Sequence, residues 1–170
     1  MDLNGKRALV CGGTSGIGKA TVSSLKENGA DVVILSRSAS GVNTISCDLE
    51  DLESLRKLVS KEIETNGPFQ ILINNSGGPP SGSLIEAQPR DFEKAFLRHV
   101  LASQTLVQLL LEGMKSSNYG RIVNVISTSV KEPIPGLGVS NTIRGAMASW
   151  SKTLSKELPP EITINNVLPG

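Results

Sequence analysis

Short apolar runs alternate with longer amphipathic stretches along the whole 170-residue chain. Runs such as RALVC at 7–11 and DVVIL at 31–35 are apolar at nearly every position, which is typical of strands buried on both faces. The stretches between the runs repeat their apolar residues at helical spacing. Strands that alternate with helices predict the α/β class, with a doubly wound parallel sheet in three layers, αβα.

The apolar runs and the turn residues around them place six strands and four helices in a single domain, residues 1–170. The strands are expected at 7–11, 31–35, around Ile45, 69–74, 121–126 and 162–167. The helices are expected at 17–28, 51–66, 89–115 and 141–158, the third as one long helix. Ligands of such sheets bind beyond the carboxyl ends of the strands, so functional residues should follow the strands in the sequence.

Charge and composition exclude several classes of partner. The 17 Lys and Arg residues and the 16 Asp and Glu residues leave a net charge of +1, which gives no general attraction to nucleic acid. No apolar run approaches the roughly 20 residues of a membrane helix, and the N-terminus lacks a signal peptide, so we expect a cytoplasmic protein with no membrane partner. Two cysteines, Cys11 and Cys47, and a single histidine lack the spacing of a metal site.

A glycine-rich turn joins the first expected strand to the first expected helix. Gly12, Gly16 and Gly18 follow the spacing G-x-x-x-G-x-G. Glycine permits positive φ and lets the backbone approach a ligand closely, and the free N–H groups of a helix start favour a pyrophosphate. No Lys-Ser or Lys-Thr pair follows the last glycine, so the turn is not a nucleoside triphosphate loop. The turn predicts a dinucleotide site.

This turn resembles the TGxxxGIG fingerprint of the short-chain dehydrogenase/reductase family, with Cys11 in place of the threonine. Three further motifs resemble the family in the same order: NNSG at 74–77, GRIVNVIS at 120–127 and NNVLPG at 165–170. The resemblance implies a Rossmann domain that transfers hydride between a nicotinamide and a small-molecule carbonyl or alcohol substrate. It implies cofactor binding by Gly12, Thr14, Ser15, Gly16, Ile17, Gly18, Asp48, Leu49, Asn75, Ser76, Gly77, Pro169 and Gly170.

The end of the second strand predicts which dinucleotide binds. A carboxylate there usually holds the ribose 2′-hydroxyl of NAD, whereas an arginine nearby accommodates the 2′-phosphate of NADP. This chain has no acid at the strand end and carries Arg37 there, whose guanidinium can pair with a phosphate. We therefore expect NADP rather than NAD, although a solvated surface arginine is the alternative.

The catalytic pattern of the family breaks in this chain. The family typically uses an Asn, a Ser and a YxxxK pair, and no YxxxK occurs here. Alignment through the following helix puts Ser140 at the Tyr position and Arg144 at the Lys position. Ser127 is retained, and His99 stands where the family has its Asn. We expect the two serines to donate hydrogen bonds to the substrate oxygen and Arg144 to hold the ribose. His99, with an ordinary pKa of about 6.5, would supply protons.

These replacements leave two other interpretations open. The chain is also consistent with an NAD(P)-binding sensor or interaction module without turnover, or with a structural domain that binds no nucleotide. The segment NSGGPP at 75–80 resembles a divergent branch of the family that lacks YxxxK and is often labelled 3-oxoacyl-carrier-protein reductase-like. A label of that kind follows the fold, so it does not identify the substrate.

Two expectations concern the whole molecule. In the family, a substrate lid, a further helix and the last strand follow the position of Gly170, so we expect this chain to lack them. The two long helices, 88–116 and 141–158, are expected to pair between subunits in a homo-oligomer.

Overall fold

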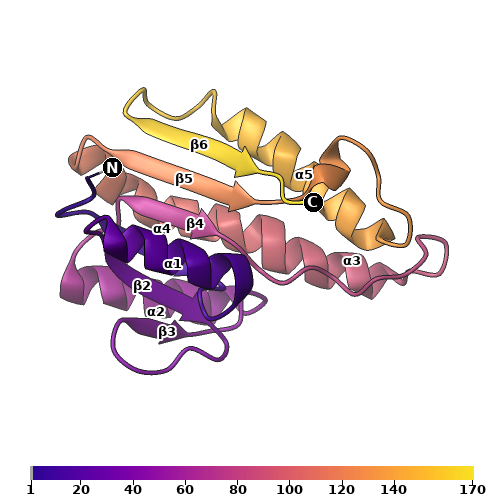
Figure 1. Ribbon diagram of the computed structural model, residues 1–170, viewed down its shortest axis with the longest axis horizontal. Coiled ribbons are helices and arrows are strands. Elements are labelled where there is room, and N and C mark those ends of the chain that lie inside the picture. The colour runs from indigo at the N-terminus through magenta and orange to yellow at the C-terminus, as the bar shows by residue number, and fades with distance from the viewer. Residues whose placement is uncertain (1) are drawn as a thin grey trace.

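A computed structural model describes residues 2–170 as one six-stranded sheet with helices on both faces (Figure 1). The strand order is β3-β2-β1-β4-β5-β6, and every neighbouring pair is parallel. The strands are β1 Arg7–Cys11, β2 Asp31–Ser36, β3 Thr44–Ser46, β4 Ile71–Asn74, β5 Gly120–Val125 and β6 Ile162–Val167. From β1 to β3 successive strands are added toward one edge of the sheet, and from β4 to β6 they are added toward the other edge. This reversal of strand order confirms the doubly wound parallel sheet of the Rossmann type.

Helices connect the strands. They are α1 Gly16–Glu27, α2 Leu52–Asn66, α3 Pro89–Phe96, α4 Ala102–Ser116 and α5 Gly138–Leu154, with a π-helical turn at Leu97–Leu101 and a 3₁₀ turn at Thr128–Val130. The connection between β2 and β3 contains no helix, as its short length predicts. No helix of residues 2–170 is long and apolar enough to cross a membrane.

Consecutive residues of the central strands are buried on opposite faces of the sheet, which explains why these runs are apolar throughout. On β1, Ala8 and Val10 belong to the core beneath α1, whereas Leu9 belongs to the core beneath α2 and α4. On β4, Ile71 and Ile73 alternate with Leu72 in the same way. Burial on both faces requires helices on both faces, so the three layers follow from this pattern.

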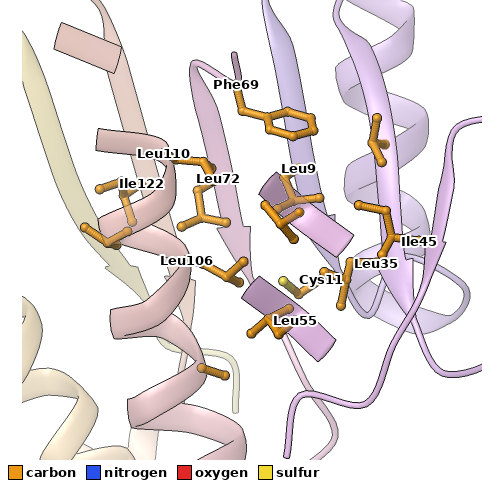
Figure 2. Packing of buried hydrophobic residues seen from close by; sticks show 14 of the residues in the cluster. Leu9, Cys11, Leu35, Ile45, Leu55, Phe69, Leu72, Leu106, Leu110 and Ile122 are labelled. Atoms are coloured by element: carbon orange, nitrogen blue, oxygen red, sulfur yellow. The ribbon is translucent and has the colours of Figure 1, made fainter. Parts of the chain in front are cut away.

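The larger core lies between the sheet and helices α2 and α4 (Figure 2). Leu9 and Leu72 of the central strands meet Leu55 of α2 and Leu106 and Leu110 of α4. The two α4 leucines are four residues apart, so both face the sheet. This packing holds the N-terminal half of α4, and the π turn before it, close to the ends of the central strands.

Two predicted helices have different limits in the structure. The expected single helix at 89–115 is interrupted by the π turn Leu97–Leu101, and such turns are frequent at functional sites. The last expected helix starts at Gly138 and ends at Leu154, so its predicted end at 158 is wrong. Beyond Leu154 the chain tightens into turns, because the N–H groups of 156 and 157 bond carbonyls three residues back.

Leu72 offers a test of this core. Its side chain is fully buried, so Leu72→Ala is expected to lower the free energy of unfolding by about 2–5 kcal/mol through lost burial and a residual cavity. Ile85→Ala is the matched control, since Ile85 is 96% exposed, and its effect should stay within about 0.5 kcal/mol. Urea denaturation measures both, and similar losses in the two variants would contradict the packing described.

Candidate active site

A groove of about 790 Å³ opens at the carboxyl ends of the strands, where the strand order reverses between β1 and β4. Most of the residues predicted to bind the cofactor line it, namely Gly12, Thr14, Ser15, Gly16, Ile17, Arg37, Asp48, Leu49, Asn75, Ser76 and Gly77. Gly18, Pro169 and Gly170 are predicted cofactor residues that do not line it. The volume is within the range of ligand pockets.

Close backbone contacts keep the glycine turn compact. A Cβ on Gly18 would lie 2.1 Å from the carbonyl oxygen of Gly12, so only glycine fits there. The Asn75 amide donates to the carbonyl oxygens of Cys11 and Gly12, both at 3.3 Å, and ties the turn to the end of β4. Gly18 thus acts through the shape of the turn rather than through the groove surface.

The start of α1 presents free donors to the groove. Ser15 is the N-cap residue, but its side chain makes no capping hydrogen bond, and the first turn contains no acidic residue. Gly16 has φ of +49°, and a Cβ there would meet nothing within 4 Å, so the backbone faces open space. A helix end with uncapped N–H groups and no local acid favours an anion such as a pyrophosphate.

Arg37 follows β2 directly at the rim of the groove. Its side chain is 71% exposed, and its one ion-pair contact is a long one, 3.9 Å from Nη1 to Asp48 Oδ2. Thr14, Ser36 and Ser38 line the same groove as Arg37, with 3.4 Å from Ser36 Oγ to each of the other two hydroxyl oxygens. A guanidinium with this weak pairing and these hydroxyls can bind a phosphate group.

A second, much smaller cavity of about 10 Å³ adjoins the groove and brings His99 and Arg144 together. Leu49, Asn75, Ser76 and Arg98 line both hollows, so the cavity lies directly beneath the groove wall. The other lining residues are Cys11, Asn74, Ala102, Ser103, Leu106, Val125 and Met147. The space is about that of a single water molecule or ligand oxygen.

His99 is 3% exposed and lies in the π turn. Its Nδ1 is 2.8 Å from the hydroxyl oxygen of Ser76, and its buried Nε2 has no hydrogen-bond partner in the structure. Burial, followed by the positive charges of Arg144 and Arg98, lowers the pKa of His99 to about 3. The expectation that His99 titrates near neutrality is therefore wrong, because at pH 7 the ring is neutral and cannot serve as a cationic proton donor.

Arg144 is 8% exposed and projects from α5 into the cavity. Its Nη1 donates to the carbonyl oxygen of Val125 at 3.0 Å. Burial lowers the pKa of Arg144, but arginine starts from so high a value that it stays cationic. None of the ion pairs among residues 2–170 includes Arg144, whereas its neighbour Arg98 is paired with Glu50.

The two predicted catalytic serines line neither hollow. Ser127 follows β5 as the N-cap of the 3₁₀ turn, where its hydroxyl accepts from the Ser129 N–H at 3.1 Å. Ser140 lies half-buried in the first turn of α5, one turn before Arg144. Pro169 lies beside the 3₁₀ turn, since its carbonyl accepts from the Thr128 N–H at 3.1 Å.

Sequence reasoning missed Arg98 and Glu50. Arg98 lines both hollows, and its ion pair with Glu50 joins the π turn to the segment after β3. Adjacent residues of a regular α-helix point about 100° apart, so nothing in the sequence indicates that Arg98 and His99 share a site. Both residues belong to the π turn, and no sequence signal identified that turn.

An amide ladder was also missed, although the sequence carries a signal for it. Asn74 donates to the Asn124 side chain at 2.8 Å, and Asn124 donates to that of Asn166 at 3.0 Å. The three asparagines lie near the carboxyl ends of β4, β5 and β6. Three strands that each carry a polar amide near the same end predict such a ladder, which holds the strand ends beneath the site in register.

The glycine turn can be tested by substitution. Gly18→Ala is expected to cost about 1–3 kcal/mol of stability, because its Cβ would overlap backbone atoms of Gly12. The matched control is Gly145→Ala, a helical site on α5 with open space at Cβ, where alanine should gain about 0.5–1 kcal/mol. Thermal denaturation of both variants checks the prediction, and a neutral Gly18→Ala would show that the turn is not closely packed.

Burial of His99 predicts a pH dependence of stability. Below pH 6.5 the unfolded chain binds a proton on this ring, whereas the folded chain does so only near pH 3. The free energy of unfolding should therefore fall by roughly 1.4 kcal/mol per pH unit as the pH drops below about 6.5. Urea denaturation between pH 7.5 and 5 measures the slope, and His99→Gln should abolish it. An equal slope in that variant would contradict the assignment.

Comparison with known proteins places this geometry in a family. A model described as short chain dehydrogenase matches residues 6–170. The chain is 31% identical to L-xylulose reductase of Mesocricetus auratus and 29% identical to carbonyl reductase (NADPH) 2 of Sus scrofa, in each case over 99% of this chain and 72% of the relative.

A solved structure agrees with the sequence comparisons. L-Sorbose reductase from Gluconobacter frateurii, in complex with NADPH and L-sorbose, matches with a TM-score of 0.92 at 25% identity, over all of this chain and 71% of that one. The similarity spans the sheet, the glycine turn and the helix that carries Arg144. The chain therefore belongs to the short chain dehydrogenase family, a family of oxidoreductases.

Proposed function

We propose that this protein is an NADP-dependent oxidoreductase that transfers hydride between the nicotinamide and a carbonyl or alcohol group of a small molecule. The observation that carries the proposal is the composition of the groove. It combines an uncapped helix N-terminus at the glycine turn with a weakly paired Arg37 at the end of β2. The relatives whose names include NADPH support the same cofactor.

Different residues of the groove would bind different parts of the cofactor. The N–H groups at the start of α1 would hold the pyrophosphate, and Arg37 with Ser36 and Ser38 would hold the 2′-phosphate. Asp48 and Leu49 would flank the adenine, and Asn75 to Gly77 would lie along the adenosine side. NADPH supplies the hydride when it is bound.

In the proposed reaction, hydrogen bonds to the substrate oxygen take the place of a titrating acid. Ser127 and Ser140 would donate to the substrate oxygen, with the proton of the product alcohol coming from water. Neutral His99 would act as a fixed hydrogen-bonding group, because its pKa of about 3 removes it from proton transfer near neutrality. Arg144 would supply a positive charge that stabilises an electron-rich ligand group.

A second candidate function is nucleotide binding without turnover. Ser140 stands where the family has its tyrosine, and a serine hydroxyl is a much weaker acid than a phenol. The low pKa of His99 leaves no replacement acid in the cavity, which favours this alternative. The expectations of a cytoplasmic location and of a homo-oligomer through α4 and α5 stay predictions.

Calorimetric titration with NADPH and NADH tests the cofactor assignment. The wild-type protein should bind NADPH in preference to NADH, and Arg37→Ser should weaken NADPH binding by about 10- to 100-fold through loss of a charged hydrogen bond, with little effect on NADH. The control is Arg56→Ser, since Arg56 is an exposed arginine on α2 that does not line the groove. An unchanged NADPH affinity in Arg37→Ser would contradict the assignment.

Turnover separates the two candidate functions. An NADPH-binding protein that oxidises NADPH with at least one compound from a panel of ketones, aldehydes and oxo acids is a reductase. An NADPH-binding protein that is inert with the whole panel, in both directions of the reaction, is a binding module.

A further inference from the structure

The segment 48–51, which joins β3 to α2, forms one wall of the groove but receives little support from the sheet. Asp48 and Leu49 line the groove. The strand before them, β3, has three residues, lies at the edge of the sheet and pairs with β2 alone. The N–H groups of Glu50 and Asp51 both bond to Asp48, at 3.0 and 3.1 Å, so these contacts stay within the segment. The position of this wall therefore depends on contacts beyond β3.

One ion pair joins this β3–α2 segment to the other half of the sheet. Oε1 of Glu50 pairs with Nη2 of Arg98, which lies in the π turn between α3 and α4. Among residues 2–170, every other hydrogen bond or ion pair of the segment has its partner between β2 and α2. Both side chains are 25% exposed, so water screens this pair less than it screens a pair on the surface.

The Arg98 end of this bridge is the firmly held end. The π turn leads directly into α4, whose Leu106 belongs to the larger core. The next residue, His99, is buried, and its Nδ1 lies 2.8 Å from the hydroxyl oxygen of Ser76, just after the central strand β4. A core helix and a central strand thus fix the π turn, and the β3–α2 segment is the part that the ion pair positions.

Leu49 connects the ion pair to the groove surface. It precedes Glu50 in the chain, lines the groove and packs against the larger core. Arg98 lines the groove as well, so the pair spans the groove wall at this place. A shift of Glu50 would carry Leu49 with it and change the space where the adenine is proposed to bind.

We propose that Arg98 and Glu50 are positioning residues for the cofactor, because their ion pair holds Leu49 at the spacing that receives the adenosine of NADP. This inference rests on the proposed cofactor site and does not depend on hydride transfer. Arg98 acts through Glu50 and Leu49 rather than through the nucleotide phosphates, since the Glu50 carboxylate already offsets its charge.

Direct attraction of the phosphates by Arg98 is the competing role, and Glu50→Gln distinguishes the two. If the pair positions the segment, glutamine loses the ion pair and NADPH should bind more weakly. If Arg98 attracts phosphate, glutamine frees the guanidinium and NADPH should bind more tightly. Arg98→Met weakens binding in both cases, so the direction of the Glu50→Gln effect decides.

Calorimetric titration with NADPH and with adenosine 2′,5′-bisphosphate, which carries only the adenosine side of the cofactor, measures this effect. Glu50→Gln and Arg98→Met should each weaken both ligands by about tenfold. The double variant should lose about the same factor, rather than the roughly 100-fold product of two independent losses, because either change alone breaks the pair.

Two exposed residues provide matched controls. Glu53→Gln removes an acid from the first turn of α2, and Arg90→Met removes an arginine from α3. Neither residue lines the groove, so both variants should bind the two ligands as the wild type does. The charge-reversed variant, with Arg98→Glu and Glu50→Arg together, restores an ion pair and should recover binding to within about threefold of the wild type.

Amide hydrogen exchange separates positioning from a general loss of stability. Glu50→Gln should speed the exchange of the N–H groups at positions 50 and 51, while those of Leu9 and Leu72 in the central strands keep the wild-type rate. Equal acceleration in the central strands would show that the pair stabilises the whole fold and would overturn the positioning role.

Three binding results would also overturn it: tighter or unchanged NADPH binding in Glu50→Gln, independent losses in the double variant, or an equal loss in Arg90→Met and Arg98→Met. Turnover of NADPH together with unchanged affinity in Glu50→Gln would leave the oxidoreductase standing and overturn the inference about the pair. The expected binding pattern without turnover of any carbonyl compound would overturn the oxidoreductase and leave the pair. A wild type that binds neither ligand would overturn both.

Discussion

The parallel direction of all six strands is the constraint on which the rest of the molecule depends. Because the strands are parallel, their carboxyl ends share one edge of the sheet, and the reversal between β1 and β4 opens a groove at that edge. The glycine turn after β1, Arg37 after β2, Asp48 after β3 and the loop after β4 reach this groove for the same reason. Burial of the strands on both faces holds this arrangement in place.

The cofactor side and the catalytic side of the site differ in how closely they keep the family pattern. The cofactor side retains the glycines, the helix start and the polar loop that the family resemblance implies, and it is built largely from backbone. The catalytic side is built from side chains, and because no YxxxK pair occurs in the sequence, the residues proposed for it depart from the family pattern. In the proposed function, such a site would bind the nucleotide through its backbone while different side chains carry the chemistry.

Buried charge determines the character of the catalytic side. Arg144 keeps its charge inside the protein, and this charge adds to the burial that lowers the pKa of His99 in the cavity beside the groove. The π turn carries both His99, which lines the cavity, and Arg98, which pairs with Glu50. The helix packing beneath the turn, through Leu106 and Leu110, keeps these groups fixed against the sheet.

The sequence by itself determined the fold and most of the groove. Apolar runs without polar alternation require a sheet covered on both faces, and the order of runs and helices requires parallel strands, so the residues that follow the strands could be named in advance. The end of the last helix and the π turn at Leu97–Leu101 could not be predicted in this way. Helix propensity depends on local sequence and does not indicate where neighbouring elements tighten or widen a helical turn.

Only the tertiary structure decided the protonation and pairing of the catalytic side. The pKa of His99 depends on burial and on two arginines, one of them 45 residues away on α5. Among residues 2–170, the lack of an ion pair at Arg144 likewise depends on which side chains the fold brings close to it. Periodicity and motif spacing depend on neighbours in the sequence, whereas electrostatics depends on neighbours in the folded chain, and that is the physical reason for the division.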